Sequence, residues 1–140
     1  MWRNSWPPSA GLRRGVKVND PLAELPRLDR AAWEDLARTT GGDRDFLSDL
    51  LQTFFDDTPK ELAVMHQSIL HNRVEEFRRA AHSLKSNSAT FGAARLSGMF
   101  REMEEMGKSG QLDGAEERLA RAEAEYGRVR PLLEAERARM

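Results

Sequence analysis

Apolar residues recur at spacings of three and four through most of residues 43–133, and this repeat constrains the fold more than any other feature of the chain. The spacing places apolar side chains on one face of an α-helix, because a helix has about 3.6 residues per turn. Four long segments carry the repeat, and no segment shows the alternating pattern of a strand. The chain is therefore predicted to be all-α, an antiparallel four-helix bundle preceded by a short N-terminal helix.

Capping residues and breaks give approximate positions for the first two helices. Asp29 is a candidate N-cap for the short helix "RAAWEDLART", which the Gly41-Gly42 pair ends. Asp43 is the corresponding N-cap for the first long helix, which extends toward residues 71–72. Within it, Thr58-Pro59 predicts either a kink or a new N-terminus.

The three remaining helices follow from the same signals. We expect the third helix at about residues 73–91, with Gly92 as its C-terminal cap, and the fourth from there to Gly107 and Gly110. The fifth begins near residue 113, and two residues within it, Gly127 and Pro131, are expected to bend or fray its end.

Residues 1–28 contain four prolines and no sustained apolar repeat, so we predict a flexible N-terminal tail or linker followed by one bundle domain over residues 29–140. This tail carries five basic and two acidic residues, which leaves 17 basic and 21 acidic residues in the domain. A net charge of minus four on the domain argues against nucleic-acid binding. The absence of cysteine excludes disulfides and thiolate chemistry.

No stretch approaches the roughly 20 apolar residues that a membrane span needs, and the N-terminus lacks the apolar segment of a signal peptide. We therefore expect a cytoplasmic protein without direct membrane contact.

His82 is the candidate reactive residue. A rotation of about 100° per residue places it roughly 130° from the centre of the apolar stripe of the third helix, so its side chain should face away from the bundle core. Cations nearby would favour the neutral imidazole and attract a phosphoryl group, and small neighbours would leave the ring accessible. The neighbours on this face are Arg78, Arg79, Lys85, Ser86 and Ala89. Geometry alone leaves open that His82 is an ordinary surface histidine.

The other two histidines serve as a comparison. His66 and His71 are five residues apart, which does not match the i, i+4 spacing of a helical metal site, and neither has a similar surround. We interpret both as surface or loop residues.

The stretch "AHSLKSNSATFGAARL", residues 81–96, resembles the signature of histidine-containing phosphotransfer (HPt) domains of multistep two-component phosphorelays. The family pattern is a histidine, any residue, leucine, lysine and a small residue, then small polar residues and Gly-Ala ten positions after the histidine. The matching residues are His82, Leu84, Lys85, Ser86, Ser88, Gly92 and Ala93. The segments "RLDRAAWEDL" and "FLSDLLQTFFDDTPKELAVMHQSI" are similar to the family's earlier helices, so the resemblance covers about residues 28–130.

The resemblance implies that His82 accepts a phosphoryl group from the aspartyl phosphate of a receiver domain and passes it to another receiver's aspartate. Lys85, with help from Arg78 or Arg79, would hold the phosphoryl oxygens. Glu104 would hydrogen-bond the other imidazole nitrogen and fix the tautomer. The family most often has glycine where this chain has Ser86, which adds a hydroxyl with little bulk.

The same resemblance implies which partners and groups take part. The partners would be receiver domains of a hybrid histidine kinase and of a response regulator, docking around Ser86 and Ala89, with Phe100 and Met99 as further candidates. The protein would have no cofactor of its own and no autonomous kinase activity, because the Mg²⁺ belongs to the receiver. We expect a monomer.

Three alternatives stay open at the level of sequence. A non-catalytic helical adaptor could bind a response regulator or kinase without carrying phosphate. A histidine-ligated metal bundle is disfavoured because no carboxylate-histidine motif recurs on facing helices. The dimerisation domain of a sensor kinase would need an ATP-binding region, and none follows in this sequence.

Overall fold

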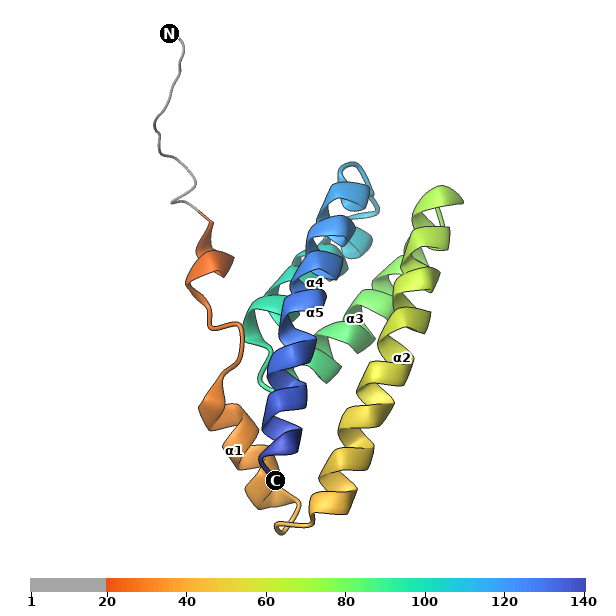
Figure 1. The fold of residues 1–140 in the computed structure, drawn as a ribbon. Helices are drawn as coiled ribbons and strands as arrows, with labels where there is room; N and C mark the ends of the chain where they lie inside the picture. Colours follow the sequence, from red (N-terminus) through yellow and green to blue (C-terminus); the bar gives the residue numbers. More distant parts are fainter. Residues whose placement is uncertain (1–19) are drawn as a thin grey trace, which may run out of the picture.

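The computed structural model describes residues 20–140, and this part of the chain consists of helices joined by short loops. The elements are the 3-10 helix η2 (Pro21–Glu24) and the α-helices α1 (Arg30–Thr39), α2 (Arg44–Leu70), α3 (Val74–Thr90), α4 (Ala94–Ser109) and α5 (Ala115–Ala138). Loops of three to five residues join α2 to α5 in succession, so neighbouring helices run antiparallel (Figure 1). The predicted all-α four-helix bundle with a short preceding helix is confirmed.

The helix starts follow the predicted caps. The Asp29 side chain accepts hydrogen bonds from the N–H groups of Ala31 and Ala32, and the Asp43 side chain accepts one from that of Phe46. α2 continues through Pro59 as one helix, so the predicted new N-terminus there is wrong. α5 likewise continues through Gly127 and Pro131 to Ala138, since packing against the bundle outweighs the local cost of these two residues.

The core lies between α2, α3, α4 and α5, with Trp33 of α1 added at one end. Phe54 makes aromatic contacts within it, with its ring centroid 5.0 Å from that of Phe91 and 6.0 Å from that of Tyr126. The buried face of α4 differs from the predicted stripe. Its members are Leu96, Phe100, Met103, Glu104 and Gly107, whereas the sequence pattern favoured Met99 and Met106.

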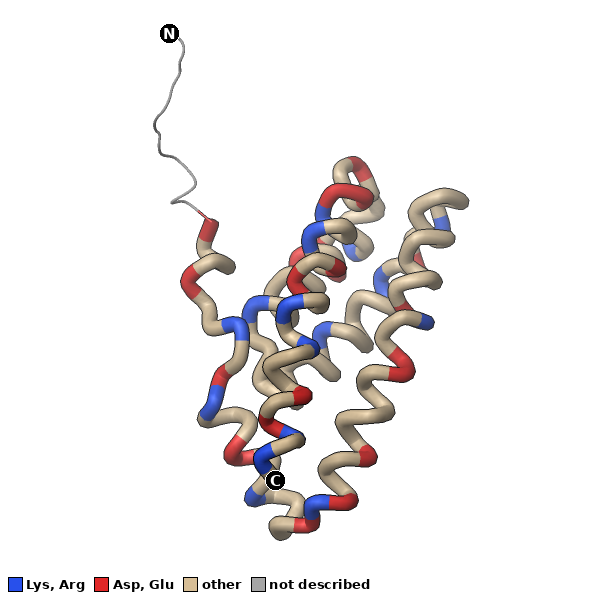
Figure 2. Tube along the Cα trace, viewed as in Figure 1, with Lys and Arg blue, Asp and Glu red and all other residues tan. Residues whose placement is uncertain are grey.

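Charged residues of both signs are interspersed along the helices (Figure 2). Two glutamates of α5 are nevertheless buried and joined to earlier segments. Glu125 is within 2.8 Å of Arg27, and Glu136 is paired with Arg30 at the start of α1. These ion pairs fix the N-terminal residues against the last helix.

The structure differs from the predicted tail at residues 20–28. This segment lies against α4, where the Arg95 guanidinium donates to the carbonyls of Ala23 and Leu25 and the Arg95 backbone N–H donates to that of Pro26. The apolar repeat cannot predict such contacts, because they use backbone carbonyls of an irregular segment. Residues 1–19 of the predicted tail lie outside the described residues.

Candidate functional site

The site is built where α3 and α4 approach each other closely. A Cβ added to Gly107 of α4 would lie 2.7 Å from Cβ of Arg78 on α3, so only a residue without a side chain fits there. Further along, the Ser97 hydroxyl of α4 donates a 2.9 Å hydrogen bond to the Lys85 carbonyl of α3. These two contacts hold the helices together on either side of His82.

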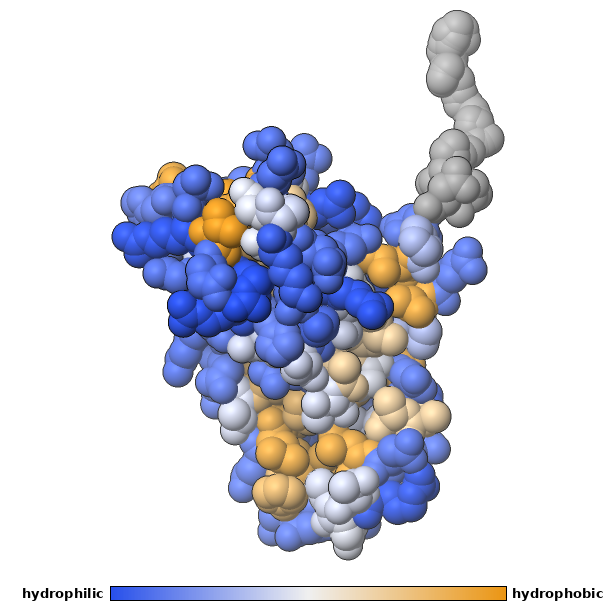
Figure 3. Space-filling model, turned by 180° about the vertical axis from the view of Figure 1, so that it is seen from behind, coloured by the Kyte–Doolittle hydropathy of each residue, from blue (hydrophilic) through white to orange (hydrophobic). Residues whose placement is uncertain are grey.

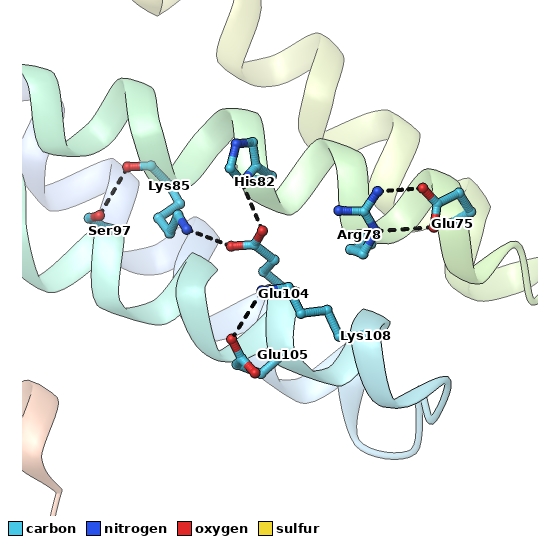
Figure 4. A network of polar contacts seen from close by, with 8 residues as sticks. All are labelled: Glu75, Arg78, His82, Lys85, Ser97, Glu104, Glu105 and Lys108. Atoms are coloured by element: carbon cyan, nitrogen blue, oxygen red, sulfur yellow. Dashed lines mark hydrogen bonds and ion pairs between the residues drawn. The ribbon is translucent and has the colours of Figure 1, made fainter.

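His82 lies on the outer face of α3 with its side chain 56% exposed, as its angular position predicts. Its Nδ1 is 2.7 Å from Oε2 of Glu104, whose side chain is only 4% exposed. The other carboxylate oxygen, Oε1, is 2.6 Å from Nζ of Lys85. One buried carboxylate therefore binds both the histidine and the lysine (Figure 4).

The electrostatics of this trio favour an ionised carboxylate. Burial alone would raise the pKa of Glu104, but the contacts with Lys85 and then with His82 outweigh it and hold the pKa below its usual value of 4.5. An ionised carboxylate only accepts hydrogen bonds, so Nδ1 of His82 carries the proton. The lone pair of the imidazole is then on Nε2, which is directed away from Glu104.

Arg78 and Arg79 do not join this trio. The Arg78 guanidinium donates two hydrogen bonds to Glu75, one turn earlier on α3 (Figure 4). Nε of Arg79 is 3.6 Å from the same carboxylate. The hydrogen bond with Glu75 raises the pKa of Arg78, and the same bond lowers the pKa of Glu75. Helical spacing predicted that both arginines lie close to His82. It could not show that the Glu75 carboxylate would bind them instead of a phosphoryl group.

The candidate docking residues divide into two groups. Ser86 and Ala89 are exposed on the same side of α3 as His82 and line a surface hollow. Phe100 is fully buried in the core and is therefore not available to a partner, and Met99 is partly buried against the core. The prediction for Phe100 is wrong because the buried face of α4 is rotated from the one that the methionines suggested.

The signature glycine has a structural role. Gly92 follows α3 with a φ of +84°, and the N–H groups of Gly92 and Ala93 donate to the carbonyls of Ala89 and Ser88, which forms a Schellman cap. A Cβ on Gly92 would lie 2.6 Å from the Asp29 carbonyl oxygen. Glycine is required here both by the backbone conformation and by the close approach of the α1 N-terminus.

The other histidines lie elsewhere. His66 is on α2 with its ring nitrogens 3.0 Å from Glu123 and 3.6 Å from Glu116 of α5, and His71 is the C-cap of α2. Within residues 20–140, no three His, Asp or Glu side chains are grouped so that they could hold a metal ion. No helix in the same range is long and apolar enough to cross a bilayer.

The site therefore consists of an exposed histidine that is hydrogen-bonded to a buried carboxylate on the surface of an antiparallel four-helix bundle. This arrangement is typical of histidine phosphotransfer domains. Comparison with known families agrees, since the family described as Hpt domain matches residues 49–137. This chain belongs to the Hpt domain family.

A solved structure supports the assignment. The crystal structure of histidine-containing phosphotransfer protein B (HptB) from Pseudomonas aeruginosa PAO1 is similar at a TM-score of 0.73 and 32% identity, over 82% of this chain and 97% of that chain. A search of curated proteins found no match. The resemblance drawn from the signature is confirmed, and the chain is a phosphorelay intermediate of the histidine phosphotransfer class.

Proposed function

We propose that His82 is the residue that carries the phosphoryl group, through its Nε2 atom. The observation behind this assignment is the hydrogen bond between Nδ1 and Glu104, which leaves the lone pair on the exposed Nε2. The donor is the aspartyl phosphate of a receiver domain, and the final acceptor is an aspartate of a second receiver.

The transfer needs no proton movement at His82. Nε2 forms a bond to phosphorus while the bond from phosphorus to the aspartate oxygen breaks, and the electron pair of that bond goes to the aspartate carboxylate. The phosphorylated ring keeps its proton on Nδ1 and gains a positive charge, which the ionised Glu104 stabilises across the 2.7 Å hydrogen bond. The reverse sequence returns the phosphoryl group to another aspartate.

Lys85 has two functions in this proposal. Its ammonium keeps Glu104 ionised, and its remaining N–H donors reach the phosphoryl oxygens from a side chain that is 29% exposed. The Mg²⁺ that supports transfer belongs to the receiver, and this chain contributes no cofactor. We expect the protein to act as a cytoplasmic monomer, with Arg78 and Arg79 adding to the positive potential near the site without contacting the phosphoryl group.

The test is phosphotransfer from a receiver domain carrying radiolabelled phosphate. The wild-type chain should acquire label that is acid-labile and alkali-stable, as phosphohistidine is, and His82→Gln should acquire none. His71→Gln, which changes the histidine capping α2, is the matched control and should be labelled like the wild type. Labelling of His82→Gln at the wild-type level would refute the assignment.

The same variant separates a relay from an adaptor that only binds its partners. A relay loses its cellular output with His82→Gln although receiver affinity is kept. An adaptor keeps both the affinity and the output.

A further inference from the structure

Residues 20–28, which we call the N-terminal strap, lie outside the four-helix bundle and outside the part that matches the family, residues 49–137. Several contacts nevertheless fix the strap. Three hydrogen bonds join the Arg95 guanidinium to strap carbonyls at 3.0–3.1 Å, and Arg27 of the strap bonds to the buried Glu125 at 2.8 Å. Directly after the strap, the Asp29 N–H donates to the Gly92 carbonyl at 2.6 Å.

Apolar contacts seat the strap on α4. A Cβ added to Gly98 would lie 2.7 Å from Cδ2 of Leu22 and 3.3 Å from Cδ1 of Leu25, so the two leucines occupy the space that a side chain would fill. Leu25 stays 37% exposed although it is held in place. In Figure 3, hydrophobic residues gather on this face close to where the described chain begins.

Leu25 also borders a hollow beside the candidate phosphoryl-transfer site. The hollow has a volume of about 490 Å³, and its lining includes Leu25, Asp29, Ala32, Lys85, Ser86 and Ala89. Lys85 belongs both to this lining and to the trio with Glu104 and His82. Through Lys85 the hollow therefore adjoins the site at which, in the proposed function, a receiver delivers its phosphoryl group.

We propose that the strap is part of the receiver-docking surface and that Leu25 is a specificity-determining contact. This inference rests on the proposed function. A receiver that places its aspartyl phosphate at Nε2 of His82 covers Ser86 and Ala89, and small residues at these positions leave room for an apolar side chain of the receiver to enter the hollow. Such a side chain meets Leu25, so receivers with a polar residue at that place bind less tightly.

Single-turnover transfer from a phosphorylated receiver, measured over a range of receiver concentrations, tests this proposal. Leu25→Asp should raise the half-saturating receiver concentration about five- to tenfold, as expected for a lost apolar contact and a desolvated charge, with little change in the rate at saturation. Arg95→Gln, which removes the three guanidinium bonds to the strap, should act in the same direction. Leu132→Asp is the matched control, because Leu132 of α5 is 39% exposed and does not line the hollow.

Phosphoramidate, a small phosphodonor that needs no docking surface, distinguishes failure of this inference from failure of the proposed function. All three variants should be labelled by phosphoramidate at the wild-type rate. The inference is overturned if Leu25→Asp and Arg95→Gln keep wild-type half-saturation within about twofold, if Leu132→Asp weakens transfer equally, or if phosphoramidate labelling falls in parallel. If no phosphorylated receiver labels the wild type, the proposed function fails and this inference fails with it.

Discussion

Replacing Glu104 by glutamine tests how the site works, because the substitution keeps the shape of the side chain and removes its charge. The amide oxygen can still accept the Nδ1 hydrogen bond of His82, so the tautomer is kept. The positive charge of the phosphorylated ring, however, is no longer balanced by a carboxylate at 2.7 Å. A hydrogen bond to a charged group exceeds a neutral one by about 1–1.5 kcal/mol, which predicts roughly a tenfold slower transfer.

The same change should lower the free energy of unfolding by about 1–2 kcal/mol. Removal of one partner from a buried ion pair costs more than this when the remaining charge is enclosed, but Lys85 is 29% exposed and can turn toward solvent. The measurements are single-turnover phosphotransfer and urea unfolding followed by circular dichroism. Glu105→Gln is the control, because Glu105 is the next residue, is 65% exposed and pairs only at 3.6 Å with Lys108.

The pH dependence of stability gives an independent readout. Because folding lowers the pKa of Glu104, the unfolded chain binds more protons between that lowered value and about 4.5, and the contribution of Glu104 to stability is lost as the pH falls through this range. The difference in unfolding free energy between wild type and Glu104→Gln should therefore have its full value at pH 6 and should decrease as the pH falls below about 4.5. Equal transfer rates together with a stability difference that does not change with pH would refute the charge-based account.

Two further predictions concern single residues of the same region. Lys85→Gln should slow transfer about tenfold at neutral pH and raise the pKa of Glu104, and it should shift the urea midpoint more than Glu104→Gln does, because the 4% exposed carboxylate loses its ammonium partner. Single-turnover transfer with parallel unfolding curves measures both effects. Gly92→Ala should lower the free energy of unfolding by at least about 1 kcal/mol, since alanine at a φ of +84° is strained and its Cβ would meet the Asp29 carbonyl. Gly127→Ala lies in the interior of α5, and the added Cβ would have no atom within 4 Å. This change should instead raise the melting temperature, because alanine has a higher helix propensity than glycine.

Much of the bundle was predictable because the signals are local. The Asp29 and Asp43 caps, the Gly92 terminus and the outward position of His82 each depend on a few neighbouring residues and on helix geometry. Pro59 shows the limit of that reasoning, since a proline that would end an isolated helix is carried within α2 by the packing around it.

The parts of the site that could not be predicted from the sequence depend on contacts between helices. On α4, positions 99 and 100 both continue a three-four repeat from Leu96, and only the packed structure shows that Phe100 is the buried one. The same rotation of the helix buries Glu104 beneath His82. Likewise, the pairing of Arg78 with Glu75 depends on side-chain direction, which spacing alone leaves open.

The two ends of the described chain lie in different surroundings, and this affects how the protein can be handled. Asp20 begins a segment that lies against α4, and its carboxylate is 3.2 Å from the guanidinium of Arg121 on α5, whereas Met140 lies near Thr40 and Leu47 at the α1–α2 end (Figure 1). An affinity tag or fluorophore attached after Met140 would therefore stand at the α1–α2 end and not beside the residues proposed to contact a receiver. The same label placed just before Asp20 would stand beside the strap and Arg121 of α5, so proteins labelled at opposite ends should be compared before any affinity for a partner is interpreted.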